Sequence, residues 1–470
     1  MSALSRNRSR LGGVAAAAAL VLTATGCASG PAPKEPQARA DAGDHYQVPI
    51  ETWTLDNGAR VLYVHRPELP MMSLKVVFDA GSARDPAGKS GLAALTARLL
   101  DQGAGELSAD AFARRVDDLG LKFGAGNGRD QLSVQVTSLT QGDTTARAWE
   151  LLTTALTAPA FAPDALARER NRLLTAIRRD KENPQSVAVK AFYREVYGDH
   201  PYAHPSEGTP SGVKAVERAD IQAFANDHFV GRNATVAVVG ALPRAEAAAL
   251  LSDTVGRLPA GEPPATLPPV PELAQAEEVF IQKDVSQAHV LMGQPGTTRD
   301  ADDYYPLLVG NYSLGGGGFA SRLMSVVREE HGLSYSVFST FAPLQRRGPF
   351  VAGLQTANAN VPKALSLLAQ EVDRFVAEGP NPDEVDAAQR YLTGSFPLKL
   401  ESNQDLKGQL ATMGFYRLGT DYLDRYLARV RDVDADAITR AMQNRLDPER
   451  MVTVIVGAER PPGFADGGDS

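Results

Sequence analysis

The sequence predicts an α+β protein built from two similar halves, each of mixed helices and strands. Three observations support this prediction. Short segments of the first half recur in the second half in the same order and at nearly the same spacing. Period-two strand patterns lie beside helical patterns. A proline-rich stretch separates the halves.

The internal repeat rests on three pairs of segments. The pairs are 118–123 with 330–335, 161–184 with 381–403, and 234–240 with 451–457. Chance matches between common helix and strand patterns are the alternative, but such matches have no reason to keep a shared order. The three pairs therefore indicate a duplication.

The elements of the first half follow in chain order. Residues 54–64 are typical of a hairpin, because Asn57-Gly58 takes the positive backbone angles of a tight turn between alternating apolar residues. The remaining expected elements are a strand at 73–80, a helix at 91–102, a strand at 131–137, and helices at 144–157 and 163–181.

Prolines mark the boundary between the halves. Residues 258–271 contain so many prolines that regular structure is excluded there. We therefore expect an N-terminal half at 48–257, a linker at 258–275, a C-terminal half at 276–460 and a disordered tail at 461–470.

The N-terminus has the pattern of an export signal. Three arginines precede a short apolar run at 14–22, and small residues lead directly to Cys27. Residues 24–27 resemble the lipobox of bacterial lipoproteins, although Ala24 replaces the usual leucine. This resemblance implies a signal peptide at 1–26, a lipid on Cys27, a Pro/Ala tether at 27–47, and the outer membrane facing the periplasm. An ordinary signal peptide with an incidental cysteine is the alternative.

Composition restricts the classes of partner. Cys27 is the single cysteine of the 470 residues, so the fold must be stable without disulfides. The net charge is -8 at pH 7, and removal of the leader arginines makes the chain more acidic. An acidic exported chain is a poor candidate for binding nucleic acid.

Three motifs together resemble those of a known family. They are Gly81–Ala93 before an expected helix, Gly198–Thr209, and Ser321–Val337. They resemble the pitrilysin/insulinase family of zinc peptidases, which includes mitochondrial-processing-peptidase-like members, from about Val48 to Gly457. The resemblance implies two homologous α/β-sandwich halves with mixed, largely antiparallel sheets, arranged as a clamshell around a chamber for an unfolded peptide.

The sequence departs from this family at the metal site. Active members carry H-x-x-E-H, in which two histidines bind zinc and the glutamate activates its water. The matching positions here are Ala94, Ala97 and Arg98, and the distal glutamate ligand aligns with Ala176, or with Glu169 if the alignment slips. Alanine has no lone pair, and arginine is a fixed cation. We therefore expect no zinc in this chain and place it on a partner subunit.

The second half keeps a different part of the family's site. Arg328 and Tyr335 match the family's Arg/Tyr pair, which the resemblance implies binds the substrate carbonyl beside the scissile bond. Guanidinium and phenol groups are donors suited to a developing oxyanion. The corresponding first-half positions are Val116 and Phe123. The alternative is an arginine in a surface ion pair and a tyrosine in a strand.

Other apparent motifs carry little chemistry. His200 and His204 have the spacing of a helical metal pair, but Pro201 and Pro205 predict a loop. The glycine tract 315–318 lacks the Gly-Lys-Ser/Thr of a phosphate loop and instead suits close backbone approach.

The leading hypothesis is a noncatalytic subunit that is inactive alone. It would pair with a zinc-bearing subunit of the same family, bind an extended peptide substrate, contribute Arg328 and Tyr335, and attach to the membrane through Cys27. The rival hypotheses are a periplasmic peptide-binding or escort pseudoenzyme without proteolytic activity, and an assembly subunit.

Overall fold

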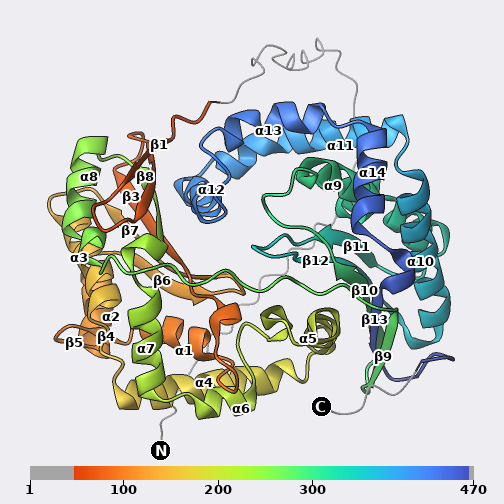
Figure 1. Cartoon of the computed structure of the whole chain (residues 1–470), viewed down its shortest axis with the longest axis horizontal. Helices are drawn as coiled ribbons and strands as arrows, with labels where there is room; N and C mark the ends of the chain where they lie inside the picture. Colours follow the sequence, from red (N-terminus) through yellow and green to blue (C-terminus); the bar gives the residue numbers. More distant parts are fainter. Residues whose placement is uncertain (1–46, 465–470) are drawn as a thin grey trace, which may run out of the picture. The chain divides into compact units, whose positions relative to one another are not determined.

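The computed structural model describes residues 47–464, which are coloured in Figure 1. The expected signal peptide, Cys27, nearly all of the tether and residues 465–470 of the expected tail lie outside the described residues. Among residues 47–464, no helix combines the length and the apolar character that crossing a bilayer requires.

The first half contains a mixed six-stranded sheet. Its order is β1-β2-β8-β3-β7-β6, with β2 and β8 parallel and the other neighbours antiparallel. The strands are β1 (Glu51–Thr54), β2 (Arg60–His65), β3 (Met71–Asp79), β6 (Lys122–Asn127), β7 (Gln131–Leu139) and β8 (Ala234–Gly240). The expected hairpin is confirmed, because β1 pairs with β2 across a turn in which Gly58 has φ of 91°.

The second half contains a five-stranded sheet of the same design. Its order is β11-β12-β10-β13-β9, and β9 and β13 are its parallel pair. The strands are β9 (Glu277–Gln282), β10 (Gln287–Pro295), β11 (Ser336–Phe341), β12 (Pro349–Ala357) and β13 (Val452–Gly457). Apart from the additional β1, the two sheets match strand for strand in order and direction. The predicted fold class of mixed, largely antiparallel sheets is confirmed.

Helices follow the strands of both halves (Figure 1). In the first half they are α1 (Leu92–Leu99), α2 (Ala109–Asp118), α3 (Thr144–Thr157), α4 (Pro163–Asp180), α5 (Pro184–Tyr197), α6 (Pro210–Ala215), α7 (Arg218–His228) and α8 (Arg244–Asp253). In the second half they are α9 (Tyr304–Asn311), α10 (Val361–Glu378), α11 (Pro382–Ser395), α12 (Asn403–Phe415), α13 (Tyr422–Arg431) and α14 (Ala435–Arg445). A small ribbon joins β4 (Gly103–Ala104) to β5 (Leu107–Ser108).

Each half supplies one helix to the sheet of the other half. Helix α5 packs on β10 and β13, and helix α12 packs on β3 and β8 (Figure 1). Phe192 of α5 is buried with Leu291 of the second sheet. Gly414 of α12 lies so close to the first sheet that a Cβ there would come within 2.4 Å of Thr235. The exchange makes the two cores depend on each other.

The segments that begin the two exchanged helices belong to one predicted repeat pair. Asn183 caps α5 through the backbone N–H groups of Gln185 and Ser186, and Ser402 caps α12 through Asp405 N–H. Such caps satisfy N–H groups that a helix start leaves without partners. The repeat therefore includes the residues that start each exchanged helix.

Residues 259–276 form neither helix nor strand, as their prolines predict. Their backbone carbonyls accept hydrogen bonds from side chains of the surrounding structure: Arg84 donates to Ala265 at 2.6 Å, and Arg346 donates to Leu267 at 2.7 Å. Leu267 and Val270 are also buried beside α5. This connection is therefore packed against the fold over much of its length.

Candidate functional site

The former metal position lies on α1. This helix begins after Gly91, which has φ of 107°, and Asp85 holds its first turn by accepting from Gly91 N–H at 2.7 Å and Ala93 N–H at 2.8 Å. Burial raises the pKa of Asp85 to about 7, while these backbone donors act in the opposite direction. Ala94 and Ala97 are buried in the core of the first half. Neither provides a ligand atom.

Helix α4 packs against α1 and brings Glu169 to Arg98. The carboxylate of Glu169 is 3.9 Å from the Arg98 guanidinium and accepts from Arg172 at 2.5 Å. Its side chain is buried, with 5% exposed. Ala176 lies about two turns further along α4. Glu169 therefore lies beside the α1 motif through its contact with Arg98.

This arrangement does not fit zinc. The His and Glu positions of α1 are occupied by two alanines and one permanent cation, and the nearby carboxylate already binds two guanidinium groups. A divalent cation there would face two fixed positive charges. Within residues 47–464, no group of three or more His, Cys, Asp or Glu side chains could hold a metal ion. These observations fit a chain that carries no zinc.

His200 and His204 lie in a loop, as predicted. Pro201–Ala203 form a single short helical turn between them. The Nδ1 atom of His200 accepts from Tyr202 N–H at 3.1 Å, so its Nε2–H donates to the Pro268 carbonyl at 3.1 Å. Burial lowers the pKa of His200, which favours this neutral form. Both ring nitrogens are therefore used within the fold.

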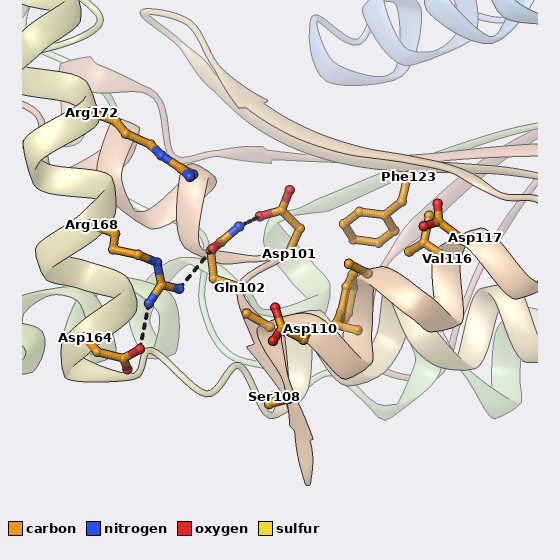
Figure 2. Close-up of a pocket in the computed structure, with 13 residues that line it drawn as sticks. Asp101, Gln102, Ser108, Asp110, Val116, Asp117, Phe123, Asp164, Arg168 and Arg172 are labelled. Atoms are coloured by element: carbon orange, nitrogen blue, oxygen red, sulfur yellow. Dashed lines mark hydrogen bonds and ion pairs between the residues drawn. The ribbon is translucent and has the colours of Figure 1, made fainter. Parts of the chain in front are cut away.

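An open pocket of about 550 Å³ lies beside α4, next to the Glu169–Arg172 pair (Figure 2). Arg172, the partner of Glu169, lines it, together with residues of α2, α4 and β6. Phe112 and Phe123 meet edge to face on its apolar side, with ring centres 5.1 Å apart. Arg168 donates to Asp164 at 2.6 Å on the opposite side. The pocket offers a binding surface and no pairing of a nucleophile with a base.

Arg328 and Tyr335 lie close together in sequence at the start of the second sheet's edge strand. Arg328 belongs to a π-helical segment, Met324–Glu330, and its guanidinium lies 4.5 Å from the centre of the Phe319 ring. Tyr335 immediately precedes β11 and is 81% exposed. In the described part of the chain, neither side chain has a recorded hydrogen bond or ion pair. The surface ion pair of the alternative interpretation is therefore not found there.

The glycine tract 315–318 supports this segment through close packing. A Cβ on Gly315 would lie 2.4 Å from the backbone nitrogen of Ser339 in β11. Gly318 has φ of 58°, in the left-handed region that glycine tolerates best. The expected close backbone approach is confirmed.

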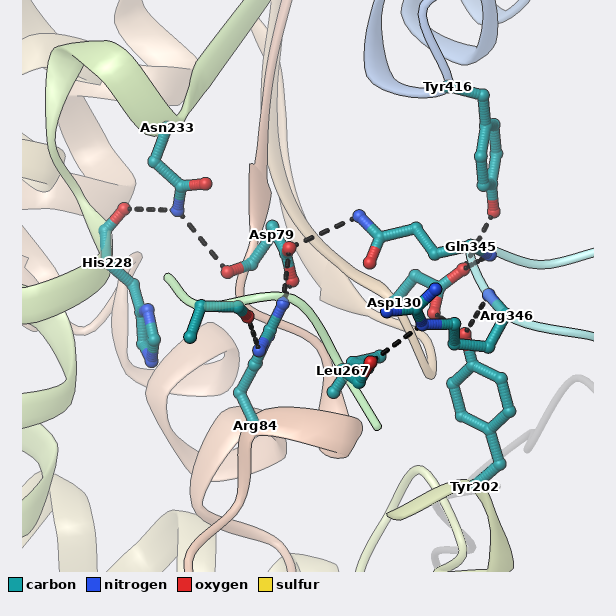
Figure 3. A network of polar contacts seen from close by, with 11 residues as sticks. Asp79, Arg84, Asp130, Tyr202, His228, Asn233, Leu267, Gln345, Arg346 and Tyr416 are labelled. Atoms are coloured by element: carbon teal, nitrogen blue, oxygen red, sulfur yellow. Dashed lines mark hydrogen bonds and ion pairs between the residues drawn. The ribbon is translucent and has the colours of Figure 1, made fainter. Parts of the chain in front are cut away.

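The sequence did not predict the buried polar junction around Asp130 (Figure 3). This carboxylate accepts from Tyr202 Oη at 2.5 Å, from Gln345 N–H at 2.8 Å and from Tyr416 Oη at 3.1 Å. Gln345 also donates to Asp79 at 3.2 Å. The junction joins the β6–β7 turn to two segments of the second half. A single aspartate just before the expected strand at 131–137 gave no signal of this role.

The fold and the altered α1 site together define a metallopeptidase fold whose metal position has been replaced. The chain belongs to peptidase family M16. Residues 60–210 match the family model described as insulinase (peptidase family M16), and residues 215–392 match the model of the peptidase M16 inactive domain. The predicted family is thereby confirmed.

Individual relatives agree with this assignment. The chain is 28% identical over 367 residues to the non-peptidase homolog YmxG of Helicobacter pylori, covering 76% of this chain and 82% of that protein. It is 23% identical over 416 residues to an uncharacterized zinc protease of Rickettsia bellii, covering 87% and 98%.

Solved structures extend the comparison. The crystal structure of a peptidase M16 inactive domain from Pseudomonas fluorescens superposes with a TM-score of 0.83 at 35% identity, covering 87% of this chain and 98% of that one. The periplasmic protease PqqL of Escherichia coli shares the fold, with a TM-score of 0.74 at 18% identity over 90% of this chain and 47% of that one. The chain thus shares its fold both with an M16 inactive domain and with a protease of that fold.

Proposed function

We propose that this chain is a membrane-anchored, noncatalytic subunit of an M16 zinc metallopeptidase. In this proposal it binds an extended peptide and supplies Arg328 and Tyr335 to a composite active site whose zinc lies on a partner subunit of the same family. The observation that carries the proposal is the contrast between a replaced metal position and a retained pair of donors, a half-buried Arg328 and an exposed Tyr335, whose side chains have no hydrogen bond or ion pair among residues 47–464.

The chemistry of the pair supports a role at a peptide carbonyl. A guanidinium and a phenol donate hydrogen bonds and cannot act here as metal ligands or as a neutral-pH base. Their use is to hold a carbonyl oxygen and to stabilise the negative charge that develops when the carbonyl is attacked. The attacking water must then be activated elsewhere, because Ala94, Ala97 and Arg98 provide no base and no metal.

The membrane and partner parts of the proposal rest on sequence. Cys27 and the leader supply the anchor, the periplasmic side of the outer membrane is the proposed location, and 27–47 is the proposed tether. The proposed division of the chain is a first peptidase-like half at 48–257, a linker at 258–275 and a second half at 276–460. Substitution of Cys27 by serine is expected to release the chain from the membrane fraction while its fold is kept.

The test combines purification with activity. The lipoprotein is extracted in mild detergent, copurifying proteins are identified, and peptide cleavage is measured for the wild type, Arg328→Ala, Tyr335→Phe and the control Arg147→Ala. Arg147 is a half-exposed arginine of α3 in a surface pair with Asp143. We expect a zinc-bearing family member to copurify and Arg328→Ala to reduce cleavage by about a hundredfold or more.

The control and the copurification result separate the alternatives. Arg147→Ala is expected to leave cleavage unchanged. Equal cleavage by wild type and Arg328→Ala would contradict the composite site. Peptide binding without a zinc-bearing partner would favour the second candidate, a periplasmic peptide-binding or escort pseudoenzyme, which the similarity to a non-peptidase homolog also supports.

A further inference from the structure

A second cavity lies where α12 meets the first sheet. It has a volume of about 790 Å³ and is lined by Lys75 of β3 and by residues of α11, α12 and the turn between them. The exchange of α12 onto the first sheet creates this cavity, because Lys75 belongs to one half and the remaining lining residues belong to the other.

The cavity carries more positive than negative charge. Lys75 and Lys399 line it, and Lys407 of α12 lies near Lys75 with 1% of its surface exposed. Within residues 47–464 none of these three lysines has a recorded ion pair. By contrast, Lys89 pairs with Asp220, and Lys190 pairs with Glu207 at 2.5 Å.

Burial lowers the pKa of all three lysines. For Lys407 burial is the main cause, the charge of Lys75 is the second, and the pKa falls to about 8. For Lys399 the charge of Arg299 adds to burial. The lowered values mean that the fold disfavours these charges as they stand, so a bound anion would stabilise them.

Two further polar side chains line the cavity, Ser395 and Asp405. The buried Ser395 Oγ has no hydrogen-bond partner in the described structure and lies in the lining. Asp405, the one carboxylate of the lining, is engaged at the helix start, where its side chain accepts from Ser402. A buried hydroxyl without a partner is uncommon in folded proteins.

Apolar surface adjoins the charged part. Tyr391 and Leu398 line the cavity and are 57% and 67% exposed, and the Tyr391 ring lies 4.9 Å from that of Tyr312. An inorganic anion has no apolar group to contact this surface. The C-terminal residue of a peptide has both a carboxylate and a side chain, and an apolar side chain there can pack on this surface.

We propose that this cavity binds the C-terminal carboxylate of a peptide, with Lys75 and Lys399 as its cationic partners and the last side chain on Tyr391 and Leu398. This inference rests on the proposed function for the presence of a peptide. The inference assigns the direction of the bound peptide, since the C-terminus of the peptide is placed at the cavity beside α12.

The test measures binding of matched peptides by fluorescence anisotropy to the full-length chain in mild detergent. Two peptides share one sequence with an apolar last residue, and they end in a free carboxylate or in an amide. We expect the free acid to bind at least about tenfold more tightly, since burial with paired cations strengthens charge recognition. Lys75→Met and Lys399→Met are expected to remove this preference.

Lys122→Met is the matched control, because Lys122 is an exposed lysine of β6 outside the cavity lining. Since Lys399 is more exposed than Lys75, its substitution keeps the test valid even if Lys75→Met fails to fold. Equal affinity for acid and amide overturns the carboxylate site and leaves peptide binding intact. If an internal glutamate restores the affinity of the amidated peptide, the site binds any carboxylate, and the assignment to a peptide C-terminus is wrong. Binding of neither peptide overturns this site together with peptide binding by the isolated chain, while the cleavage test of Arg328 stands separately.

Discussion

The two halves share one sheet design but differ in the chemistry placed on it. At the start of the first sheet's edge strand, Phe123 packs with Phe112, and Val116 lies nearby in the same pocket. At the equivalent place in the second sheet, Arg328 and Tyr335 are left available. The strand order is therefore preserved by the core, whereas side chains at strand starts differ without altering it.

The exchanged helices differ in the same way. Helix α5 covers the second sheet with an apolar face that includes Ala188, Phe192 and Val196. Helix α12 covers the first sheet with Leu410 and Ala411 but also buries Lys407. One exchanged helix therefore serves packing, and the other combines packing with a buried charge.

The largest expected effect is the loss of α5 packing. Phe192 is 1% exposed and contacts the second sheet, so Phe192→Ala is expected to lower the free energy of unfolding by about 3–5 kcal/mol. Urea unfolding measures the change. The control is Val189→Ala on the exposed side of α5, which is expected to change stability by less than about 0.5 kcal/mol. Equal effects of the two substitutions would show that α5 does not hold the second sheet.

A second substitution makes α12 resemble α5. Lys407→Met removes a buried cation while keeping an unbranched side chain, and we expect it to raise the free energy of unfolding at pH 7 by about 2–3 kcal/mol. The pKa of Lys407 is about 8 in the folded chain against 10.5 as its ordinary value, so the unfolded chain binds more protons between these values. The free energy of unfolding of the wild type should therefore rise between about pH 8 and pH 10.5. The higher stability of Lys407→Met relative to the wild type should disappear over this range.

Thermal unfolding of both proteins between pH 7 and pH 10.5 measures this convergence. Lys122→Met is again the control, because Lys122 is an exposed lysine of β6. A constant difference between the wild type and Lys407→Met across this range would contradict a buried charge on α12.

The polar junction between the halves gives a smaller expected effect. Asp130→Asn leaves one acceptor oxygen for donors from Tyr202, Tyr416 and Gln345, and we expect a loss of about 1–2 kcal/mol near pH 4. Burial raises the pKa of Asp130 above 3.8, so the folded chain keeps this proton to higher pH than the unfolded chain. The contribution of Asp130 to the free energy of unfolding of the wild type therefore falls as pH rises above 3.8. The difference in stability between the wild type and Asp130→Asn should become smaller.

Chemical unfolding of the wild type and Asp130→Asn between pH 4 and pH 7 measures this change in their stability difference. Tyr416→Phe removes one donor and keeps the carboxylate, so its deficit should not narrow in this way. A deficit of Asp130→Asn that grows with pH would show that the folded chain favours the charged carboxylate.

Much of the fold was predictable because periodicity and repeats are local properties of the sequence. The hairpin at Asn57-Gly58, the helix after Pro163 and the equivalence of β8 with β13 all follow from such patterns. The replaced metal position was equally readable, since Ala94 and Ala97 lack ligand atoms whatever the fold.

What the sequence could not predict depends on contacts between distant segments. Lys407 carries the signature of an ordinary surface lysine, and its burial arises when α12 crosses to the other sheet. Asp130 gains its partners from residues 72 and 286 positions away. The contact of Glu169 with Arg98 likewise depends on how α4 packs against α1, which the sequence does not show.

The smallest expected effect compares buried glutamates of the two halves. Glu169 is held by Arg98 and Arg172, whose side chains are 42% and 65% exposed. Glu371 pairs with Arg374, which is 52% exposed, and also lies near Arg322, which is 17% exposed. Charge pairs that reach solvent are screened and weak. We expect Glu169→Gln to cost about 1 kcal/mol and Glu371→Gln to cost more.

Unfolding in urea at low and high salt distinguishes the two. The deficit of Glu169→Gln should shrink in high salt because its partners are exposed, and the deficit of Glu371→Gln should change less. Equal deficits that ignore salt would mean that Arg98 does not interact with Glu169 as a charge. Arg98 would still place a permanent cation at the former metal position, but Glu169 would not be its charge partner.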